Sequence, residues 1–285
     1  MKRLWIVACV FCLVAIITTP GNAADTAPPV TAVLGAFDIE IELLKTEMTA
    51  AHDTTFMGVS FTRGILEGRD VVLAEVGIGK TNAAMTTTLL IDHFNPGEVL
   101  FTGIAGGLSP ALLPGDIVIG AMTAHHDATY MTTDSLVTMA SWNPISGERN
   151  PVLIPADERL LDLANRAGAQ AELEKIAVSD GERTVQIIEG VIATGDSFIA
   201  SESKKEDLRR RLHADAVEME GAAVAQVCHQ MSTPCIVIRS ISDMADSRSA
   251  EDMERFSRIA ANNSASIVRA MVALLARDTV RVNER

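Results

Sequence analysis

Apolar and polar positions alternate between strand-like and helix-like spacing along most of the chain. With one exception, each strand-like run is followed by helical spacing or by a glycine-rich turn before the next strand-like run begins. This order is typical of an α/β domain. This alternation predicts a single α/β domain over residues 30–277. The predicted strands lie at 30–34, 57–63, 71–76, 98–102, 117–120, 184–193, 216–218 and 235–239, and the predicted helices at 38–44, 80–93, 155–167, 203–213, 221–230 and 250–276.

The first 23 residues have the pattern of a cleavable signal peptide. Lys2 and Arg3 precede an apolar run over 4–19, and Gly21 and Ala23 supply the small-x-small pattern before a cleavage site. The run is shorter than the roughly 20 apolar residues of a membrane-spanning helix. We therefore expect cleavage after Ala23 and a periplasmic or secreted mature protein.

Short segments flank the predicted domain. Residues 24–29 have the composition of a flexible lead-in, and 278–285 are predicted to form a frayed tail.

The chain is acidic, with 24 Lys and Arg against 37 Asp and Glu and a net charge of −13. Cleavage of the signal peptide makes it more acidic still, because Lys2 and Arg3 leave with no acid. Nucleic acids and anionic membranes bind clustered Lys and Arg. The densest basic run, 209–211, is predicted to be a solvated helix face. We expect no nucleic-acid partner and no membrane association after cleavage.

Cysteine content argues against a disulfide framework. Cys9 and Cys12 leave with the signal peptide, so only Cys228 and Cys235 remain. The first is predicted to lie within a helix and the second in a strand. Two buried free thiols are therefore favoured over a bridge.

Three short motifs suggest cofactors but lack the full pattern. The pair His125-His126 with Asp127 has no further ligand at metal-site spacing. Gly77-Ile78-Gly79-Lys80 lacks the glycine spacing of a phosphate loop, and the glycines of 103–107 do not form the dinucleotide fingerprint. We expect neither metal nor organic cofactor.

Two carboxylates, Glu218 and Glu220, stand between an apolar step and a helix rich in small residues. If the backbone is extended there, both side chains point to one side of the strand. Such a pair suits a group that becomes cationic, such as a sugar losing its base at C1. The alternative is an exposed turn with two solvated acids. A second candidate is Asp243, which follows the strand at 235–239, at the strand end where open α/β sheets bind ligands.

Over roughly residues 33–275 the chain resembles the nucleoside phosphorylase and nucleosidase superfamily, and most closely its 5′-methylthioadenosine/S-adenosylhomocysteine nucleosidases. The resemblance implies a three-layer αβα fold with a central mixed β-sheet, a homodimer, and hydrolysis of a purine nucleoside without metal or organic cofactor. It is carried by six blocks in order: Gly35-Ala36 with Glu40, Val76-Gly77-Ile78-Gly79-Lys80, Thr102-Gly103-Ile104-Ala105-Gly106-Gly107, Thr194-Gly195-Asp196-Ser197-Phe198-Ile199, Val217-Glu218-Met219-Glu220 and Arg239-Ser240-Ile241-Ser242-Asp243.

The resemblance also implies roles for the catalytic residues. Asp243 matches the acid that protonates purine N7, with its carboxyl group held by Ser242, and that role requires a carboxyl that carries a proton. Glu40 matches the base that activates the attacking water. Arg239 and Glu218 match the groups around that water.

The implied substrate-binding residues surround these. Glu220 matches the acceptor for the ribose hydroxyls, and its charge favours an oxocarbenium-like transition state. Phe198 is expected to stack on adenine and Ile199 to bond the base edge through its backbone. The remaining implied lining residues are Met219, Ile78, Phe37 and Met253 in the apolar floor and 5′ pocket, and Ile104, Ala105 and Gly106 of the glycine-containing block.

The sequence departs from the nucleosidase pattern at two places, and it differs from the phosphorylases at a third. Ile104 stands where the nucleosidases usually have Ser, which removes one polar contact near the water or ribose. The stretch after Ala124, which in the family helps to cover the neighbouring subunit's 5′ pocket, matches only at His126-Asp127-Ala128. Phe101 stands where phosphorylases carry an Arg for phosphate, and a neutral ring cannot neutralise that anion.

We therefore expect an exported hydrolase of adenosine-type nucleosides. A phosphate-dependent phosphorylase and a non-catalytic exported nucleoside-binding protein are the alternatives. Glu40 and Asp243 argue against a pure binder, which needs neither.

Overall fold

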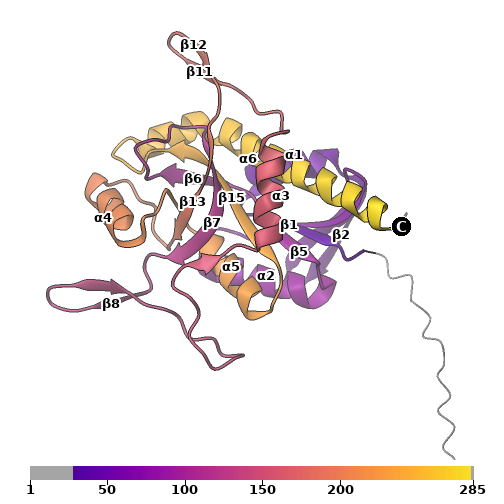
Figure 1. The fold of residues 1–285 in the computed structure, drawn as a ribbon, viewed down its shortest axis with the longest axis horizontal. Coiled ribbons are helices and arrows are strands. Elements are labelled where there is room, and N and C mark those ends of the chain that lie inside the picture. Colours follow the sequence, from indigo (N-terminus) through magenta and orange to yellow (C-terminus); the bar gives the residue numbers. More distant parts are fainter. Residues whose placement is uncertain (1–27, 284–285) are drawn as a thin grey trace, which may run out of the picture.

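An eleven-stranded mixed sheet forms the centre of the computed structural model, which describes residues 28–283 (Figure 1). The predicted signal peptide lies outside the described residues. The strand order is β10-β7-β13-β14-β6-β15-β5-β1-β4-β3-β2. The strands of this sheet are β1 Thr31–Gly35, β2 Thr49–Phe56, β3 Val59–Leu66, β4 Arg69–Glu75, β5 Glu98–Phe101, β6 Ile104–Gly107, β7 Ile117–His125, β10 Ile154–Pro155, β13 Ile187–Thr194, β14 Ala216–Glu218 and β15 Cys235–Asp243.

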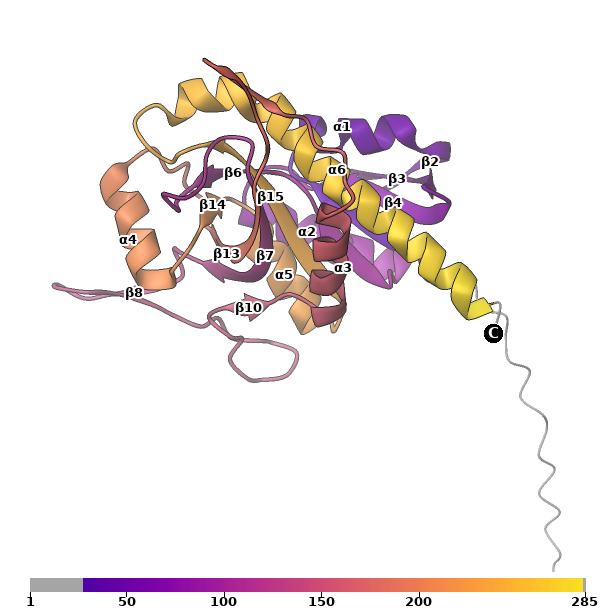
Figure 2. The ribbon, with the colours of Figure 1, turned by 45° about the horizontal axis from the view of Figure 1, so that its top comes forward.

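Helices cover both faces of this sheet, which confirms the three-layer αβα fold (Figures 1 and 2). On one face lie α2 (Lys80–Phe94) and α5 (Gly221–Gln230). On the other lie α1 (Asp38–Glu47), α3 (Glu158–Gly168) and the long α6 (Ser249–Asn283). The last helix, α4 (Glu202–Leu212), packs against the ends of β13 and β14.

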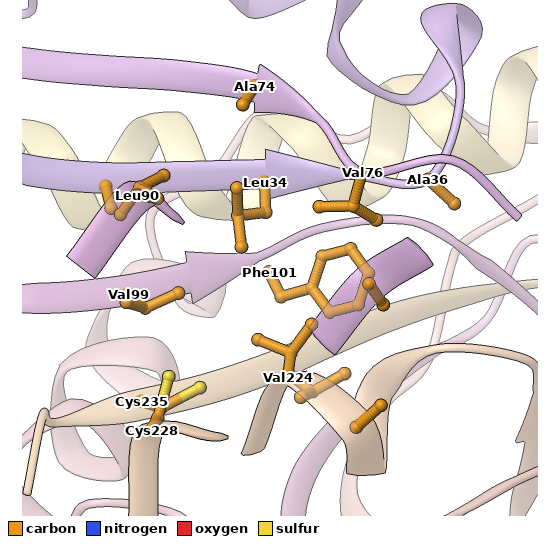
Figure 3. Packing of buried hydrophobic residues seen from close by; sticks show 14 of the residues in the cluster. Leu34, Ala36, Ala74, Val76, Leu90, Val99, Phe101, Val224, Cys228 and Cys235 are labelled. Carbon is orange, nitrogen blue, oxygen red and sulfur yellow. The ribbon is translucent and has the colours of Figure 1, made fainter. Parts of the chain in front are cut away.

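The central strands are apolar at successive positions because both of their faces are covered. Leu34 and Phe101 lie in the cluster beneath α2 and α5 (Figure 3). Val33 and Leu100, their neighbours in sequence, lie beneath α1 and α6. Alternate side chains of a strand point to opposite faces, so a strand buried on both faces is apolar throughout.

Five strands close on themselves at one side of the sheet. β7 pairs with β13 in parallel and also with β15 in antiparallel orientation, and β14 and β6 complete the ring. Gly120 of β7 permits this closure, because a Cβ there would lie 2.8 Å from both the Ile192 Cδ1 and the Val237 carbonyl oxygen. The closure brings β6 and the ends of β14 and β15 together.

Two small hairpins lie outside the main sheet. The first, β8 (Thr129–Met131) with β9 (Leu136–Thr138), extends away from the body of the protein, as Figures 1 and 2 show. The second is β11 (Ile176–Val178) with β12 (Gly181–Arg183).

The structure contains strands that were not predicted, β2 and β8 to β12, and it differs from the predicted elements elsewhere too. The predicted strand at 57–63 is one arm of the β2–β3 hairpin, and Met57 lies in its turn with φ 50°. The glycine-rich stretch expected to be a loop forms β6, because it pairs with β14 and β15. The predicted end at 276 is wrong, since α6 continues through the expected tail to Asn283.

Among the described residues one helix, α6, is long and apolar enough to cross a membrane by length and composition. Of its apolar window, 56% is buried inside the protein, as in the core helix of a globular domain.

Candidate active site

A cavity of about 300 Å³ opens where β6, β14 and β15 meet α1 and α6. Thirteen of the fifteen predicted site residues line it, and they come from seven separate parts of the chain. The lining residues are Phe37, Glu40, Ile78, Ile104, Ala105, Gly106, Phe198, Val217, Glu218, Met219, Glu220, Ser242, Asp243 and Met253.

Glu40 is held rigidly at the floor of this cavity. It lies in the first turn of α1, and its carboxylate accepts hydrogen bonds from Ala36 N at 2.5 Å and Ile104 N at 2.9 Å. Burial raises the pKa of Glu40, while Arg239 and these amides oppose the rise. Gly103 allows the close approach, because a Cβ there would lie 2.6 Å from Glu40 Oε1.

Arg239 lies behind the cavity rather than in its wall. Its side chain is fully buried, and Nη2 forms an ion pair of 2.8 Å with Oε2 of Glu218. The guanidinium also lies over the Phe101 ring, 4.0 Å from its centroid. Arg239 therefore faces Glu218 and Phe101. Its charge acts to lower the pKa of Glu40, but its side chain does not line the cavity.

The Glu218 carboxylate lines the cavity but is fully engaged by the protein. Besides Arg239, it accepts hydrogen bonds from the Thr194 hydroxyl, from Glu220 N at 3.1 Å and from Gly221 N at 2.7 Å. The last two amides belong to the N-terminus of α5, where a carboxylate is favoured. Glu218 thus joins α5 to β15. Sequence reasoning missed Thr194, although it lies in one of the six blocks.

Glu220 reaches the cavity by a different route from the one predicted. Its φ of −136° and ψ of −36° are not extended, and it is the N-cap residue of α5. The prediction that both acids point to one side of a strand is therefore wrong, because β14 ends at Glu218. Glu220 Oε1 accepts a hydrogen bond from Gly79 N at 2.7 Å. Burial, followed by the charge of Glu218, raises the pKa of Glu220 to about 8.

Asp243 ends β15 at a bulge in its pairing with β6. The Ser242 hydroxyl donates to Asp243 Oδ2 at 2.9 Å, which is the contact that the resemblance implied, and Ala245 N donates to Oδ1 at 2.9 Å. Asp243 is 2% exposed and lines the cavity beside Gly106. A Cβ at Gly106 would lie 3.0 Å from Asp243 Oδ1, so a larger residue there would require the Asp243 carboxylate to shift.

Apolar side chains form the remaining walls. Ile78, Phe198 and Met253 are 58%, 49% and 36% exposed in this single chain, so they form an apolar rim. Ile199 does not line the main cavity. It lines an adjoining hollow of about 30 Å³, whose wall also includes Phe198 and Asp243.

Three loops are tied together at the mouth of the cavity by contacts that sequence reasoning did not find. Lys80 Nζ forms an ion pair of 2.6 Å with Asp127 Oδ1, and Lys80 N donates to Asp196 Oδ1 at 2.8 Å. Asp196 N donates to Asp127 Oδ2 at 3.1 Å. These contacts fix the loop that carries Ile78 and Gly79. The signal was present, because Lys80 and Asp196 lie in two of the six blocks and Asp127 in the short match at 126–128.

Within residues 28–283 no cluster of three or more His, Cys, Asp or Glu side chains is arranged to hold a metal ion.

The family model of the phosphorylase superfamily matches residues 30–273. A 5′-methylthioadenosine/S-adenosylhomocysteine nucleosidase of Geobacillus kaustophilus (strain HTA426) is 39% identical over 245 residues, covering 86% of this chain and 97% of the relative.

Two solved structures extend the comparison. The nucleosidase of the same name from Neisseria meningitidis, in complex with methylthio-immucillin-A, has a TM-score of 0.75 and 37% identity, covering 86% of this chain and 98% of that one. Futalosine hydrolase of Helicobacter pylori strain 26695 has a TM-score of 0.73 and 31% identity, covering 86% of this chain and 97% of that one.

Proposed function

The chain belongs to the phosphorylase superfamily and, within it, to the 5′-methylthioadenosine/S-adenosylhomocysteine nucleosidases, and we infer that it hydrolyses the N-glycosidic bond of adenosine-type nucleosides. The products are adenine and the ribose moiety. The observation that carries this conclusion is the charge of the cavity: among its described lining residues, Glu40, Glu218, Glu220 and Asp243 are acidic and none is Lys or Arg.

This charge pattern suits a nucleoside and water rather than a nucleoside and phosphate. Departure of the base leaves positive charge on the sugar, which Lys or Arg side chains in the wall would oppose and acidic side chains do not. A phosphate nucleophile needs a cation at the site. The nearest guanidinium, that of Arg239, is already paired with Glu218, and Phe101 occupies the position of the phosphorylase Arg.

We propose that Asp243 and Glu40 act on opposite sides of the bond that breaks. Asp243 protonates N7 of the purine, with its carboxyl oriented by Ser242 and Ala245 N. Glu40 accepts a proton from the attacking water. The two amides on Glu40 fix its position, and a base with a raised pKa takes up a proton more readily than an ordinary glutamate.

The remaining residues hold the substrate. Glu220 accepts hydrogen bonds from the ribose hydroxyls. Gly79 N binds its Oε1, which leaves the other carboxylate oxygen for the substrate. Phe198 stacks on the base, and its backbone neighbour Ile199 lies at the base edge. Phe37, Ile104 and Met253 give the cavity an apolar wall for the 5′ substituent.

Release of adenine from 5′-methylthioadenosine in phosphate-free buffer tests this function directly. Hydrolysis predicts full turnover without phosphate and no increase when phosphate is added. Turnover that requires phosphate would assign the chain to the phosphorylases. Saturable binding with no adenine release would make it a nucleoside-binding protein. S-adenosylhomocysteine and adenosine, measured beside it, report the preferred 5′ group.

We further propose that the protein is a homodimer through the segment 128–153. This segment exposes large apolar side chains, with Tyr130 59%, Met131 75%, Trp142 62% and Ile145 68% exposed. Exposed apolar surface of this extent marks an interface, and the same segment carries the hairpin that extends from the body (Figure 2). Light scattering after size-exclusion chromatography should give twice the chain mass. A monomer at micromolar concentration would contradict the proposal.

We also propose export with a mature N-terminus at Ala24, on the basis of the sequence pattern before that residue. N-terminal sequencing of the protein recovered outside the cytoplasm tests this. A soluble cytoplasmic product that retains Met1 would overturn it.

A further inference from the structure

A second cavity, of about 360 Å³, lies away from the active site, between the end of α5 and the start of β15. Two cysteines line it, Cys228 of α5 and Cys235 of β15. The rim includes the exposed residues Pro155, His229 and Ser232, so the cavity reaches the protein surface.

The two thiols lie in contact with each other. Both side chains line the same cavity, and Figure 3 shows their sulfur atoms side by side. Both cysteines are free in the structure. Two buried free thiols are what the sequence predicted for this pair, and the last turn of α5 lies beside the first residue of β15.

We propose that Cys228 and Cys235 form a thiol–disulfide exchange site, in which a small-molecule disulfide enters this cavity, reacts at Cys235 and leaves the two cysteines joined by a disulfide bond. The product would tie α5 to β15 at the ends opposite the active site. The same two elements carry Glu220 and Asp243 at their other ends.

The order of the two steps follows from the surroundings of each sulfur. Cys235 is 8% exposed and begins its strand at the cavity, whereas Cys228 is 0% exposed. Burial raises the pKa of the Cys228 thiol, so it stays protonated and does not begin the exchange. The Cys235 sulfur, which is nearer the cavity opening, is therefore the first nucleophile.

The reaction balances as two successive exchanges. The Cys235 sulfur attacks one sulfur of the small disulfide, forms a mixed disulfide and releases one small thiol. The Cys228 sulfur then attacks the Cys235 sulfur, its proton passes to the leaving group, and a second small thiol departs. The protein dithiol loses two electrons and two protons, and the small disulfide gains them.

Incubation of the folded protein with hydroxyethyl disulfide, followed by trypsin digestion and mass spectrometry, tests the site. Both cysteines fall in one tryptic peptide, residues 212–239, which separates the readout from Cys9 and Cys12. In the wild type this peptide should lose two hydrogen atoms without retaining an adduct, and dithiothreitol should restore its mass.

Matched variants separate the two cysteines. Cys228→Ser should keep the hydroxyethylthio adduct on Cys235, because the second thiol is missing. Cys235→Ser should remain unmodified over the same time. An unchanged wild-type peptide in the folded protein would overturn the proposal. Equal adducts in both variants would also overturn it, since the thiols would then react through unfolding rather than through the cavity.

Discussion

Replacing Glu218 with Gln distinguishes a carboxylate that holds the fold from one that acts on substrate. Glu218 is buried and bonded to Arg239, to the Thr194 hydroxyl and to two amides at the start of α5. Glu220, two residues later, accepts a single hydrogen bond from Gly79 N. We therefore expect the two substitutions to change stability by very different amounts.

The expected size follows from the buried ion pair. Removing one partner of such a pair leaves an uncompensated charge, here on a fully buried Arg239, and costs about 3–5 kcal/mol. In a domain of this length, that loss lowers Tm on the order of 10 °C. The double variant Glu218→Gln with Arg239→Met should recover part of the loss, because the unpaired cation is also removed.

The stability of the wild type should depend on pH through Glu220, and this dependence should be weaker in Glu220→Gln. The pKa of Glu220 in the folded protein is about 8, against a reference value of 4.5. A raised folded-state pKa means that its stabilising contribution is fully present below the reference value and is lost as the pH rises through about 8. Wild-type stability should therefore fall over this window. Glu220→Gln, which does not titrate, should show a flatter profile.

Scanning calorimetry of wild type, Glu218→Gln, Glu220→Gln and the double variant, at several values from pH 5 to pH 8 and without ligand, measures these effects. A Glu218→Gln protein that melts within about 2 °C of wild type yet has lost activity would refute the reasoning, since Glu218 would then act on the reaction rather than through Arg239.

Four further predictions concern catalysis. Asp243→Asn should lose about 10²–10⁴-fold in kcat on adenosine-type substrates but little on a nitrophenyl riboside, whose leaving group needs no proton; equal losses on both would exclude Asp243 as general acid. Glu40 must be ionised to accept a proton, and burial raises its pKa. As the pH is lowered, kcat/KM should therefore begin to fall at a higher pH than it would with an ordinary glutamate as the base. Glu40→Gln should abolish this acid limb of the pH profile. Glu220→Gln should lose the preference for adenosine over 2′-deoxyadenosine, measured as binding affinity; an unchanged preference would remove its ribose role. Lys80→Met should raise KM by about two- to fivefold, and Asp127→Asn should raise it by the same factor. The double variant should show no further increase, because both substitutions break the same partly exposed ion pair.

Local features of the sequence were enough to predict most of the fold. The apolar runs of β1 and β15 and the helical spacing of α2 and α5 depend only on neighbouring residues and on burial of both sheet faces. Elements whose form depends on a distant partner were not predicted. β6 has four residues, two of them Gly, and it is a strand only because β14 and β15 pair with it.

The candidate site shows the same division. The family resemblance, matched block by block, predicted Glu40, Glu220 and Asp243 as members of one site. Sequence could not show that Arg239 faces Glu218 behind the cavity, or that the sulfur atoms of Cys228 and Cys235 meet. The first contact joins β15 to β14 and the second joins β15 to α5, and which side chains meet across two elements depends on how their faces pack. Only the tertiary structure decides that packing.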